Sequence, residues 1–328
     1  MSKIKLIYDL GELGKAAIHA IGGKAAHLGE LIKKNIPIPE GFVLSTSAFE
    51  RFINRSPFRQ KMREMLDKEI TLEEIISTSE TLQKLILETE LAPELEQPII
   101  QRYNELKQKS SRPLQVAVRS SANVEDLSET SFAGQADTFL CITTSDELIE
   151  SIKKCWASLY SARALMYIQQ MVKVPLNLVS MGVIVQRMVT SEISGVMFTA
   201  NVLTKDINQV LISATWGFGE CIADGTVDCD SITIDKITRE IIKTRIGPKL
   251  KMSVKNPETD GTLLIDTPLD KQETLCLTED LIQKLVQYGI QIEKHFNGDP
   301  QDIEWAIEDG KIKTLQSRNI THLGLPKK

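Results

Sequence analysis

The chain lacks the cysteine pattern of a disulfide-stapled or zinc-binding protein. Its five cysteines are odd in number, and no two of them have the C-x-x-C spacing of a zinc or redox site. They are Cys141, Cys155, Cys221, Cys229 and Cys276. We therefore expect buried free thiols, which are typical of a cytosolic protein.

Long apolar runs are also missing. No run approaches the roughly 20 residues that span a bilayer, and the longest candidates, such as Val179–Val185, have the length of a strand. The N-terminal segment is interrupted by charges and glycines, unlike the apolar core of a signal peptide. These absences predict a soluble, cytoplasmic protein with no membrane partner.

An excess of basic residues is absent as well. The 39 Lys and Arg residues and 44 Asp and Glu residues give a formal net charge of -5. This balance argues against a chain that mainly coats nucleic acid, although it does not exclude a local basic pocket for phosphates. At ~150 residues per domain, the 328 residues suggest two domains or one two-lobed unit.

Several common nucleotide-binding and hydrolase motifs are absent too. GELGK (11–15) and GGK (22–24) do not complete the Walker A pattern, and WGFGE (216–220) lacks the third glycine of a dinucleotide-binding fold. The four histidines show no metal-ligand spacing, and the GxSxG nucleophile motif is missing. We therefore predict no dinucleotide fold, no histidine metal centre and no protein nucleophile.

The apolar pattern that is present predicts a helix-rich first half and a strand-rich second half. Residues 25–34 read as a helix, and residues 47–108 alternate apolar pairs with charges, as in a run of short amphipathic helices. A strand at 138–142 and a long helix at 146–171 follow. From about residue 181 most segments have strand character, with one late helix at 279–296. This order is typical of an α+β protein and not of a doubly wound parallel sheet.

We divide the chain into two lobes on this pattern. The first lobe covers residues 1–190 and contains a helical insert at about 50–110, which we expect to be solvated and remote from the chemistry. The second lobe covers residues 191–328 and holds most of the strands.

The segment QDIEWAIEDGKIKTLQSRN (301–319) predicts a β-hairpin. Its strands, at 302–307 and 311–317, are joined by one of two turns. A two-residue Asp-Gly turn pairs the flanking Glu and Lys, whereas a three-residue loop places Gly310 in the left-handed conformation. The two turns make different predictions for the faces of the hairpin.

The three-residue loop separates the two faces cleanly, whereas the two-residue turn mixes polar and apolar residues on both. We therefore predict the longer loop, which pairs Asp302 with Gln316 and Glu304 with Thr314, with Arg318 on the same face. Two carboxylates two residues apart suit Mg²⁺, which prefers oxygen ligands, and a guanidinium beside them suits phosphate oxygens. From this segment alone, a solvated strand face is an equal alternative.

Two polar segments of the first lobe have the composition of anion sites. VAVRSSANVEDLSETSFAGQ (116–135) places Arg119 at the end of a strand, followed by two serines, and its FAGQ end suggests a mobile flap. IGGKAAHLGEL places Lys24 at a helix N-terminus, where the dipole and unpaired N–H groups favour a phosphate. Taken alone, a polar loop and an ordinary Gly-Lys helix start are the alternatives.

Taken together, these segments occur in the order of one known family. The chain resembles the N-terminal nucleotide-binding domain of phosphoenolpyruvate synthase, which pyruvate phosphate dikinase and rifampin phosphotransferase share. The matching segments are GGKAAHLGELIKKNIPIPEGFVLSTSAF, VAVRSSANVEDLSETSFAGQADTFL, CWASLYSARALMY, VIVQRMV, SGVMFTAN, WGFGE and QDIEWAIEDGKIKTLQSRNIT. The resemblance extends from about Gly22 to Thr321, is weakest in the helical insert, and implies a two-lobed ATP-grasp-like fold with ATP between the lobes.

The resemblance also implies roles for individual residues. Lys24, Arg119 and Arg318 would act on the phosphates as catalytic residues, and Asp302 and Glu304 would hold Mg²⁺. Further ligands of the nucleotide would be Ser120, Gln186, Met188, Glu220 and Gln316. The chain departs from the family at Cys229-Asp230, where a Pro-Asp pair is usual.

The activity that the resemblance implies is that of an ATP-dependent phosphotransferase of the dikinase type. In the family, this domain transfers a pyrophosphoryl group from MgATP to a histidine on a separate swivelling domain, and a third domain passes phosphate to pyruvate or to an antibiotic hydroxyl. The family's Thr/Ser-His-Ala motif is absent here. We therefore expect a phosphocarrier-histidine partner, and no phosphoenolpyruvate synthesis by the chain alone.

Two alternatives to this activity stay open. The first is the antibiotic-modifying branch of the family, with a rifamycin as acceptor, because the acceptor domain, which decides the branch, is not in the sequence. A nucleotide-sensing module without turnover is the second alternative, although the intact set of Lys24, Arg119, Glu304 and Arg318 argues against it.

Overall fold

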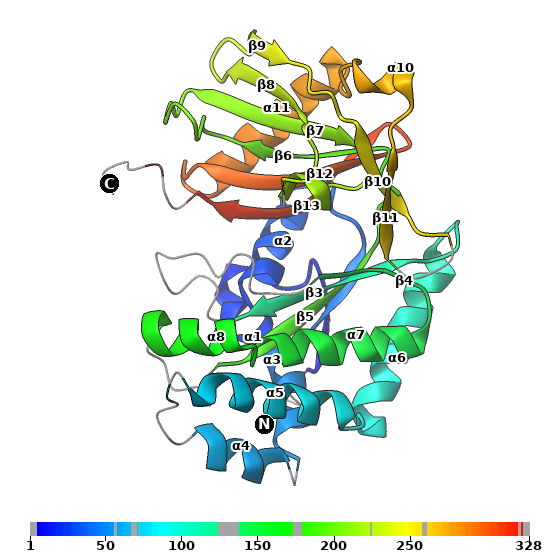
Figure 1. The fold of residues 1–328 in the computed structure, drawn as a ribbon, viewed down its shortest axis with the longest axis vertical. Coiled ribbons are helices and arrows are strands. Elements are labelled where there is room, and N and C mark those ends of the chain that lie inside the picture. Colours follow the sequence, from blue (N-terminus) through cyan, green and yellow to red (C-terminus); the bar gives the residue numbers. More distant parts are fainter. Residues whose placement is uncertain are drawn as a thin grey trace. The chain divides into compact units, whose positions relative to one another are not determined.

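The computed structural model describes residues 5–55, 58–66, 71, 73–123, 138–172, 179–223, 225–257, 261–320 and 323. It divides into two compact units, which are shown in Figure 1 and described separately below. The first comprises Met1–Glu30 and Glu40–Met188, and the second comprises Leu31–Pro39 and Val189–Lys328. Residues 31–39, which the sequence analysis places in the first lobe, therefore belong to the second unit.

The first unit is built on an antiparallel sheet with the strand order β1-β2-β5-β3-β4. Its strands are β1 (Ile7–Asp9), β2 (Gly41–Leu44), β3 (Val116–Ala122), β4 (Thr138–Ile142) and β5 (Met181–Arg187). Its helices are η1 (Lys15–Ala17), α1 (Ile18–Ile21), α2 (Gly23–Lys33, which continues into the second unit), α3 (Thr46–Ile53), α4 (Phe58–Leu66), α5 (Glu74–Glu88), α6 (Pro93–Lys109), α7 (Ser145–Ser158), α8 (Ala162–Tyr167) and η2 (Ile168–Val172).

The core of the first unit joins one face of this sheet to helices α3 to α8. Phe49 and Phe52 of α3 lie against Trp156 of α7, with ring centroids 5.9 and 5.0 Å apart. Leu82 of α5 and Ile99 of α6 are buried in the same cluster. The helical insert is therefore part of the core, and only its charged faces are solvated as predicted.

Two predicted elements of the first unit differ from the structure. Strand β3 continues to Ala122, so Arg119 lies within the strand and not at its end. The single long helix predicted at 146–171 is broken, because Ser161 caps a new helix by accepting a hydrogen bond from the Ala164 N–H at 3.2 Å. Strand β4 has the bounds that the sequence predicts, whereas the FAGQ segment lies outside the described residues.

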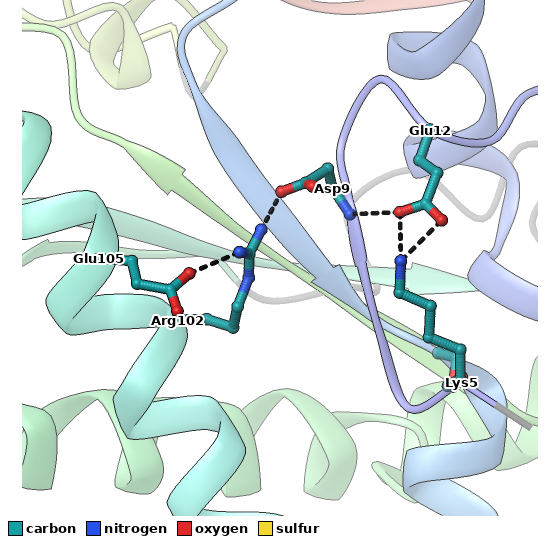
Figure 2. A network of polar contacts seen from close by, with 6 residues as sticks. Lys5, Asp9, Glu12, Arg102 and Glu105 are labelled. Carbon is teal, nitrogen blue, oxygen red and sulfur yellow. Dashed lines mark hydrogen bonds and ion pairs between the residues drawn. The ribbon is translucent and has the colours of Figure 1, made fainter. Parts of the chain in front are cut away.

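A chain of ion pairs joins helix α6 to strand β1 on the first unit (Figure 2). Arg102 of α6 contacts Asp9 and, at 2.6 Å, the carboxylate of Glu105. The Asp9 N–H donates to Glu12 at 3.2 Å, and Lys5 lies 2.5 Å from the same carboxylate. These contacts attach the last helix of the insert to the edge strand of the sheet.

Replacing Arg102 with alanine is expected to destabilise the chain by about 1 kcal/mol, because partly exposed ion pairs contribute little individually. Urea unfolding should show this loss at low salt and a smaller loss in 1 M NaCl, since salt screens such pairs. Lys84→Ala is the matched control, because Lys84 lies 3.7 Å from Glu88 on an exposed helix face. A loss that is independent of salt would assign the effect to the packing of the Arg102 side chain instead.

The second unit contains a six-stranded antiparallel sheet and a separate hairpin. The sheet has the order β13-β12-β6-β7-β8-β9. The strands are β6 (Ile193–Phe198), β7 (Gln209–Trp216), β8 (Asp230–Asp235), β9 (Ile241–Arg245), β10 (Lys251–Lys255), β11 (Thr262–Asp266), β12 (Gln301–Glu308) and β13 (Lys311–Asn319). The helices are α9 (Glu220–Ala223), α10 (Leu269–Gln272) and α11 (Glu279–His295).

Helix α11 covers one face of the six-stranded sheet (Figure 1). Its buried residues Ile282, Leu285 and Ile292 share a cluster with Ile303 and Trp305 of β12. Over Gln301–Trp305 of β12, buried residues alternate with partly exposed residues. The opposite face, called the open face below, therefore presents its side chains away from α11.

The segment 31–39 is an integral part of the second unit. Leu31 and Ile36 are buried in the cluster under the sheet. The carbonyl of Pro37 accepts a hydrogen bond from the Thr314 N–H of β13 at 2.8 Å. The turn after helix α2 thus supports one edge of the sheet that the end of the chain forms.

The turn between β12 and β13 has two residues, so the predicted three-residue loop is wrong. Asp309 and Gly310 have φ angles of 51° and 67°, and Glu308 pairs with Lys311. Positive φ at both central residues is the geometry of the type I′ hairpin turn, which Asp-Gly favours.

A bulge then changes the register along the hairpin. The pairing shifts between Glu304 and Trp305, so that Glu304 faces Gln316 and Asp302 faces Arg318. The predicted partners, Gln316 for Asp302 and Thr314 for Glu304, are therefore wrong. The bulge adds one residue to β13, which returns the four polar side chains to one face, as the sequence analysis expected.

All five cysteines are free thiols, and four of them are buried. The prediction of buried free thiols is thus confirmed except at Cys229, which is partly exposed. Within the described part of the chain, no helix has both the length and the apolar character needed to cross a bilayer.

Candidate functional site

The Gly-Gly-Lys segment and strand β3 lie in direct contact within the first unit. Lys24 Nζ donates to the Ser120 carbonyl at 3.2 Å, and the Ala25 N–H donates to Ser121 Oγ at 3.1 Å. Gly22 lies so close to the backbone of β3 that a Cβ on it would lie 1.9 Å from the Ser121 carbonyl oxygen. The Gly-Gly-Lys segment and the Arg-Ser-Ser segment of β3, which are far apart in the sequence, thus lie in contact.

Replacing Gly22 with alanine should disrupt this contact, because Gly22 also has a φ of 80° that L-residues rarely adopt. We expect destabilisation of about 3 kcal/mol or more, measured by urea unfolding, as backbone strain and steric overlap add. Gly298→Ala is the matched control, with a φ of 82° and nothing within 4 Å of the added Cβ. Equal losses in the two variants would show that the close approach to β3 contributes nothing.

The register of β3 and β5 decides which side chains of the first unit share a face. Arg119 pairs with Ile184, and Ala117 pairs with Gln186, so Arg119 and Gln186 lie on one face. Ser120 lies on the opposite face and is almost fully buried. Its hydroxyl has no hydrogen-bond partner among the described residues, so a ligand beside Arg119 would meet Ser120 only through its backbone.

Met188 follows strand β5 and is held on both sides. Its backbone N–H donates to the Gln115 carbonyl at 2.8 Å, and its sulfur accepts the Cys141 N–H at 3.1 Å. Cys141 is fully buried and has a φ of 63°, at an irregular pairing of β3 and β4. The Met188 carbonyl accepts a long hydrogen bond from Arg187 Nη1 at 3.4 Å, and a carbonyl oxygen has a second lone pair that would serve a ligand. The sequence carries no signal for the role of Cys141.

On the open face of the second unit, Arg318 and Asp302 form an ion pair. Arg318 Nε and Nη2 lie 2.8 and 2.7 Å from Asp302 Oδ2. Burial raises the pKa of the Asp302 carboxyl above its ordinary value, the Arg318 guanidinium opposes that rise, and the charge of Glu304 adds to it. The open face thus holds two carboxylates, Asp302 and Glu304, beside one guanidinium and the amide of Gln316.

The donor chemistry of this face fits Mg²⁺. Asp302 and Glu304 supply hard carboxylate oxygens from alternate positions of one strand. Among the described residues, no group of three or more His, Cys, Asp or Glu side chains could hold a metal. A cation at this pair would therefore take its remaining ligands from water or phosphate, which is how Mg²⁺ is commonly bound.

Glu220 makes contacts that the sequence analysis did not anticipate. It is exposed at the start of α9, and it accepts hydrogen bonds from Ser253 Oγ, at 2.6 Å, and from Thr262 Oγ1. A Cβ on Gly217 would lie 2.0 Å from the Ser253 carbonyl oxygen. The WGFGE segment therefore anchors hairpin β10–β11, and a nucleotide contact by Glu220 would have to share or replace these two hydroxyls.

Asp230, in the dipeptide that departs from the family pattern, forms a fully buried ion pair. Lys249 Nζ lies 2.5 Å from Asp230 Oδ1, with both side chains 0% exposed. The N–H groups of Gly247 and Cys276 also donate to Asp230, at 3.0 and 2.8 Å. Burial, followed by the charge of Asp230, raises the pKa of the Cys276 thiol well above its ordinary range. Lys249 could not be predicted from the sequence, because nothing in a Lys-rich segment distinguishes the buried lysine.

Comparisons with known proteins agree on one family. A family profile described as "Pyruvate phosphate dikinase, AMP/ATP-binding domain" matches residues 18–328. A probable phosphoenolpyruvate synthase of Methanocaldococcus jannaschii is 38% identical over 99% of this chain and 27% of its own length. A probable phosphoenolpyruvate synthase of Archaeoglobus fulgidus is 40% identical, over 97% of this chain and 42% of its own. The phosphoenolpyruvate synthase of Pyrococcus furiosus is 35% identical, over 95% and 43%. The chain thus spans less than half the length of these relatives.

Solved structures give weaker matches. D-alanine–D-alanine ligase from Bacillus anthracis aligns over 95% of this chain and 58% of its own, with a TM-score of 0.36 and 8% identity. The Helicobacter pylori ligase aligns over 67% and 46%, with a TM-score of 0.31 and 10% identity. These scores are too low to carry an argument, so the family assignment rests on the sequence matches.

Proposed function

Because the chain belongs to the family of pyruvate phosphate dikinase AMP/ATP-binding domains, we propose that it uses MgATP to phosphorylate or pyrophosphorylate a histidine on a separate phosphocarrier domain. The match over residues 18–328 carries this proposal. We further propose pyruvate as the final acceptor, because the curated relatives are named phosphoenolpyruvate synthases. A cytoplasmic location is part of the same proposal.

The side chains of each unit support a role in binding phosphates. In the first unit, Lys24 lies at the start of α2 with its ammonium group 3.2 Å from a β3 carbonyl, and Arg119 lies on β3 itself. In the second unit, Arg318 and Gln316 share the open face with the carboxylate pair. Cationic and amide donors of this kind bind phosphate oxygens.

Phosphoryl transfer requires little covalent chemistry from the protein. It requires mainly that the phosphates be positioned and that their developing charge be neutralised. Lys24, Arg119 and Arg318 would neutralise charge on phosphate oxygens, and Asp302 and Glu304 would hold Mg²⁺. The metal would supply further charge neutralisation when bound. The nucleophile is the histidine of the partner domain.

Transfer of label tests this proposal. The chain is incubated with β-³²P-ATP, Mg²⁺ and a histidine-bearing domain prepared from one of the curated relatives. We expect label on the histidine domain, stable to base and labile to acid as a phosphohistidine is. Tight ATP binding without transfer, also when the histidine domain is supplied in excess, would favour a nucleotide sensor. Absence of ATP binding would contradict both.

A further inference from the structure

The segment 237–246 exposes four isoleucines within ten residues. The exposed fractions are 79% for Ile237, 38% for Ile241, 53% for Ile242 and 47% for Ile246. Single exposed apolar residues are common on protein surfaces, whereas a concentration of them marks an interaction site. The exposed isoleucines lie on strand β9 and in the residues just before and after it.

Strand β9 ends the six-stranded sheet (Figure 1). It pairs with β8 on one side, with a register shift that leaves Ile242 without a partner on β8, and all five of its residues are exposed. Among the described residues, no strand pairs with its outer side. An edge of this kind presents unpaired N–H and C=O groups, which are able to accept one more strand.

Two basic side chains of β9 lie on the open face. Lys243 pairs with Thr233, and Arg245 pairs with Ser231. Thr233 and Ser231 alternate along β8 with Ile232 and Ile234, which are buried on the side of the sheet that α11 covers. Thr233, Ser231 and the two basic residues that pair with them therefore lie on the open face. Neither Lys243 nor Arg245 has an ion-pair partner in the part of the chain that the structure describes. The edge therefore offers two positive charges two residues apart on one face.

These charges disfavour a second copy of the chain as the occupant in the two registers that pair them with each other or with themselves. When two identical strands pair about a two-fold axis, residues of the same face lie opposite each other. The register centred on Lys243 places that lysine opposite itself. The register centred on Thr244 places Lys243 opposite Arg245. Like charges opposite each other destabilise a strand pair.

We propose that β9 is a docking edge for an extended acidic segment of another protein, which adds to the sheet as one more strand. Carboxylates at alternate positions of that segment face Lys243 and Arg245. The residue between these two carboxylates lies opposite Thr244, and apolar side chains on either side of them lie opposite Ile242 and Ile246. Opposite charges across a strand pair are favourable, so the charges that disfavour self-pairing in these two registers favour an acidic partner.

Lysines on an edge also serve simply to prevent pairing. That role explains Lys243 and Arg245 but leaves the four isoleucines exposed without a function. A protected edge gains nothing from apolar β-branched side chains, which raise the tendency to form strands. A docking edge uses both features.

The probe for a test is a fluorescein-labelled peptide of sequence Thr-Val-Glu-Val-Glu-Val-Thr, acetylated and amidated at its ends. A second peptide carries lysine at the two glutamate positions. Fluorescence anisotropy with the full chain should show binding of the glutamate peptide, weaker in 0.5 M NaCl, and no comparable binding of the lysine peptide. Equal binding of the two peptides would overturn the proposal.

The variant K243E/R245E should bind the glutamate peptide about tenfold more weakly or worse and should gain affinity for the lysine peptide. The matched control is K284E/K294E, which makes the same charge change on exposed lysines of α11. An equal loss in the control would assign binding to net charge and overturn the assignment to β9. A glutamate peptide N-methylated at alternate residues should not bind, and retained affinity would exclude strand addition.

Discussion

Replacing Glu304 with alanine should lower Mg²⁺-dependent transfer of label from ATP by at least about 100-fold, because removal of a group that organises charge at a transferring phosphate typically has this effect. Glu304 shares the open face of the β12–β13 hairpin with Asp302, opposite Gln316. The loss should appear in transfer to the histidine domain and in the Mg²⁺ dependence of ATP binding.

The fold should survive this change, because Glu304 is partly exposed and lies away from the apolar cluster under the sheet. Asp309→Asn is the matched control. It removes one carboxylate from the same hairpin, in the exposed turn, where asparagine also tolerates the positive φ. We expect the control to retain transfer. Normal MgATP binding and transfer by Glu304→Ala would show that the metal is held elsewhere.

Replacing Lys249 with methionine should cost about 3–5 kcal/mol of stability, the typical result of leaving one member of a buried ion pair without its partner. Both side chains of the Lys249–Asp230 pair are 0% exposed. Lys249 also donates to the Gly247 carbonyl at 2.7 Å, so its loss leaves a second buried acceptor unsatisfied. Urea unfolding monitored by tryptophan fluorescence measures the effect.

Two further variants isolate the cause. Lys251→Met removes the lysine of an exposed pair with Asp266 and should cost less than about 1 kcal/mol. The N–H groups of Gly247 and Cys276 donate to different oxygens of Asp230, and asparagine keeps one of these two acceptors. The double variant K249M/D230N removes both charges of the buried pair and leaves one N–H without its acceptor. It should still be more stable than Lys249→Met alone, because a buried charge without a partner costs more than one unsatisfied N–H. A double variant as unstable as the single one would contradict the uncompensated charge as the cause.

Local sequence signals predicted much of the fold. The helix after Gly-Gly-Lys, strand β4 and the late helix α11 all occur within a few residues of their predicted bounds. These elements have clear stop signals or a single apolar face, so their pattern is decided by neighbouring residues. The α+β class follows from the order of such elements and is confirmed by the strands and helices described.

The hairpin shows where local signals stop. Alternation of polar and apolar residues correctly placed four polar side chains on one face, but it cannot distinguish registers that differ by two residues, because both have the same faces. The bulge beside Trp305 determines which of these registers the hairpin adopts. A bulge depends on packing against neighbouring strands, which the hairpin sequence alone does not contain.

Contacts between distant segments were the other limit. The Lys24 contact with β3, the hydroxyls on Glu220 and the Lys249–Asp230 pair each join residues that are 19 to 96 positions apart. Motif matching named Lys24 and Glu220 but gave no neighbour for either. Lys249 lies in no recognised motif, and its burial became evident only from the structure.

The place of residues 31–39 has a consequence for synthesis on the ribosome. Leu31 and Ile36 emerge early, yet the cluster that buries them includes Trp305, and the partner of the Pro37 carbonyl is on β13. Domains usually fold in the order of their synthesis. In the second unit, Leu31 and Ile36 cannot reach their buried positions until β12 and β13 have been synthesised. Folding of the second unit is therefore a late, non-local event, which the exposure of these two apolar residues on the nascent chain precedes.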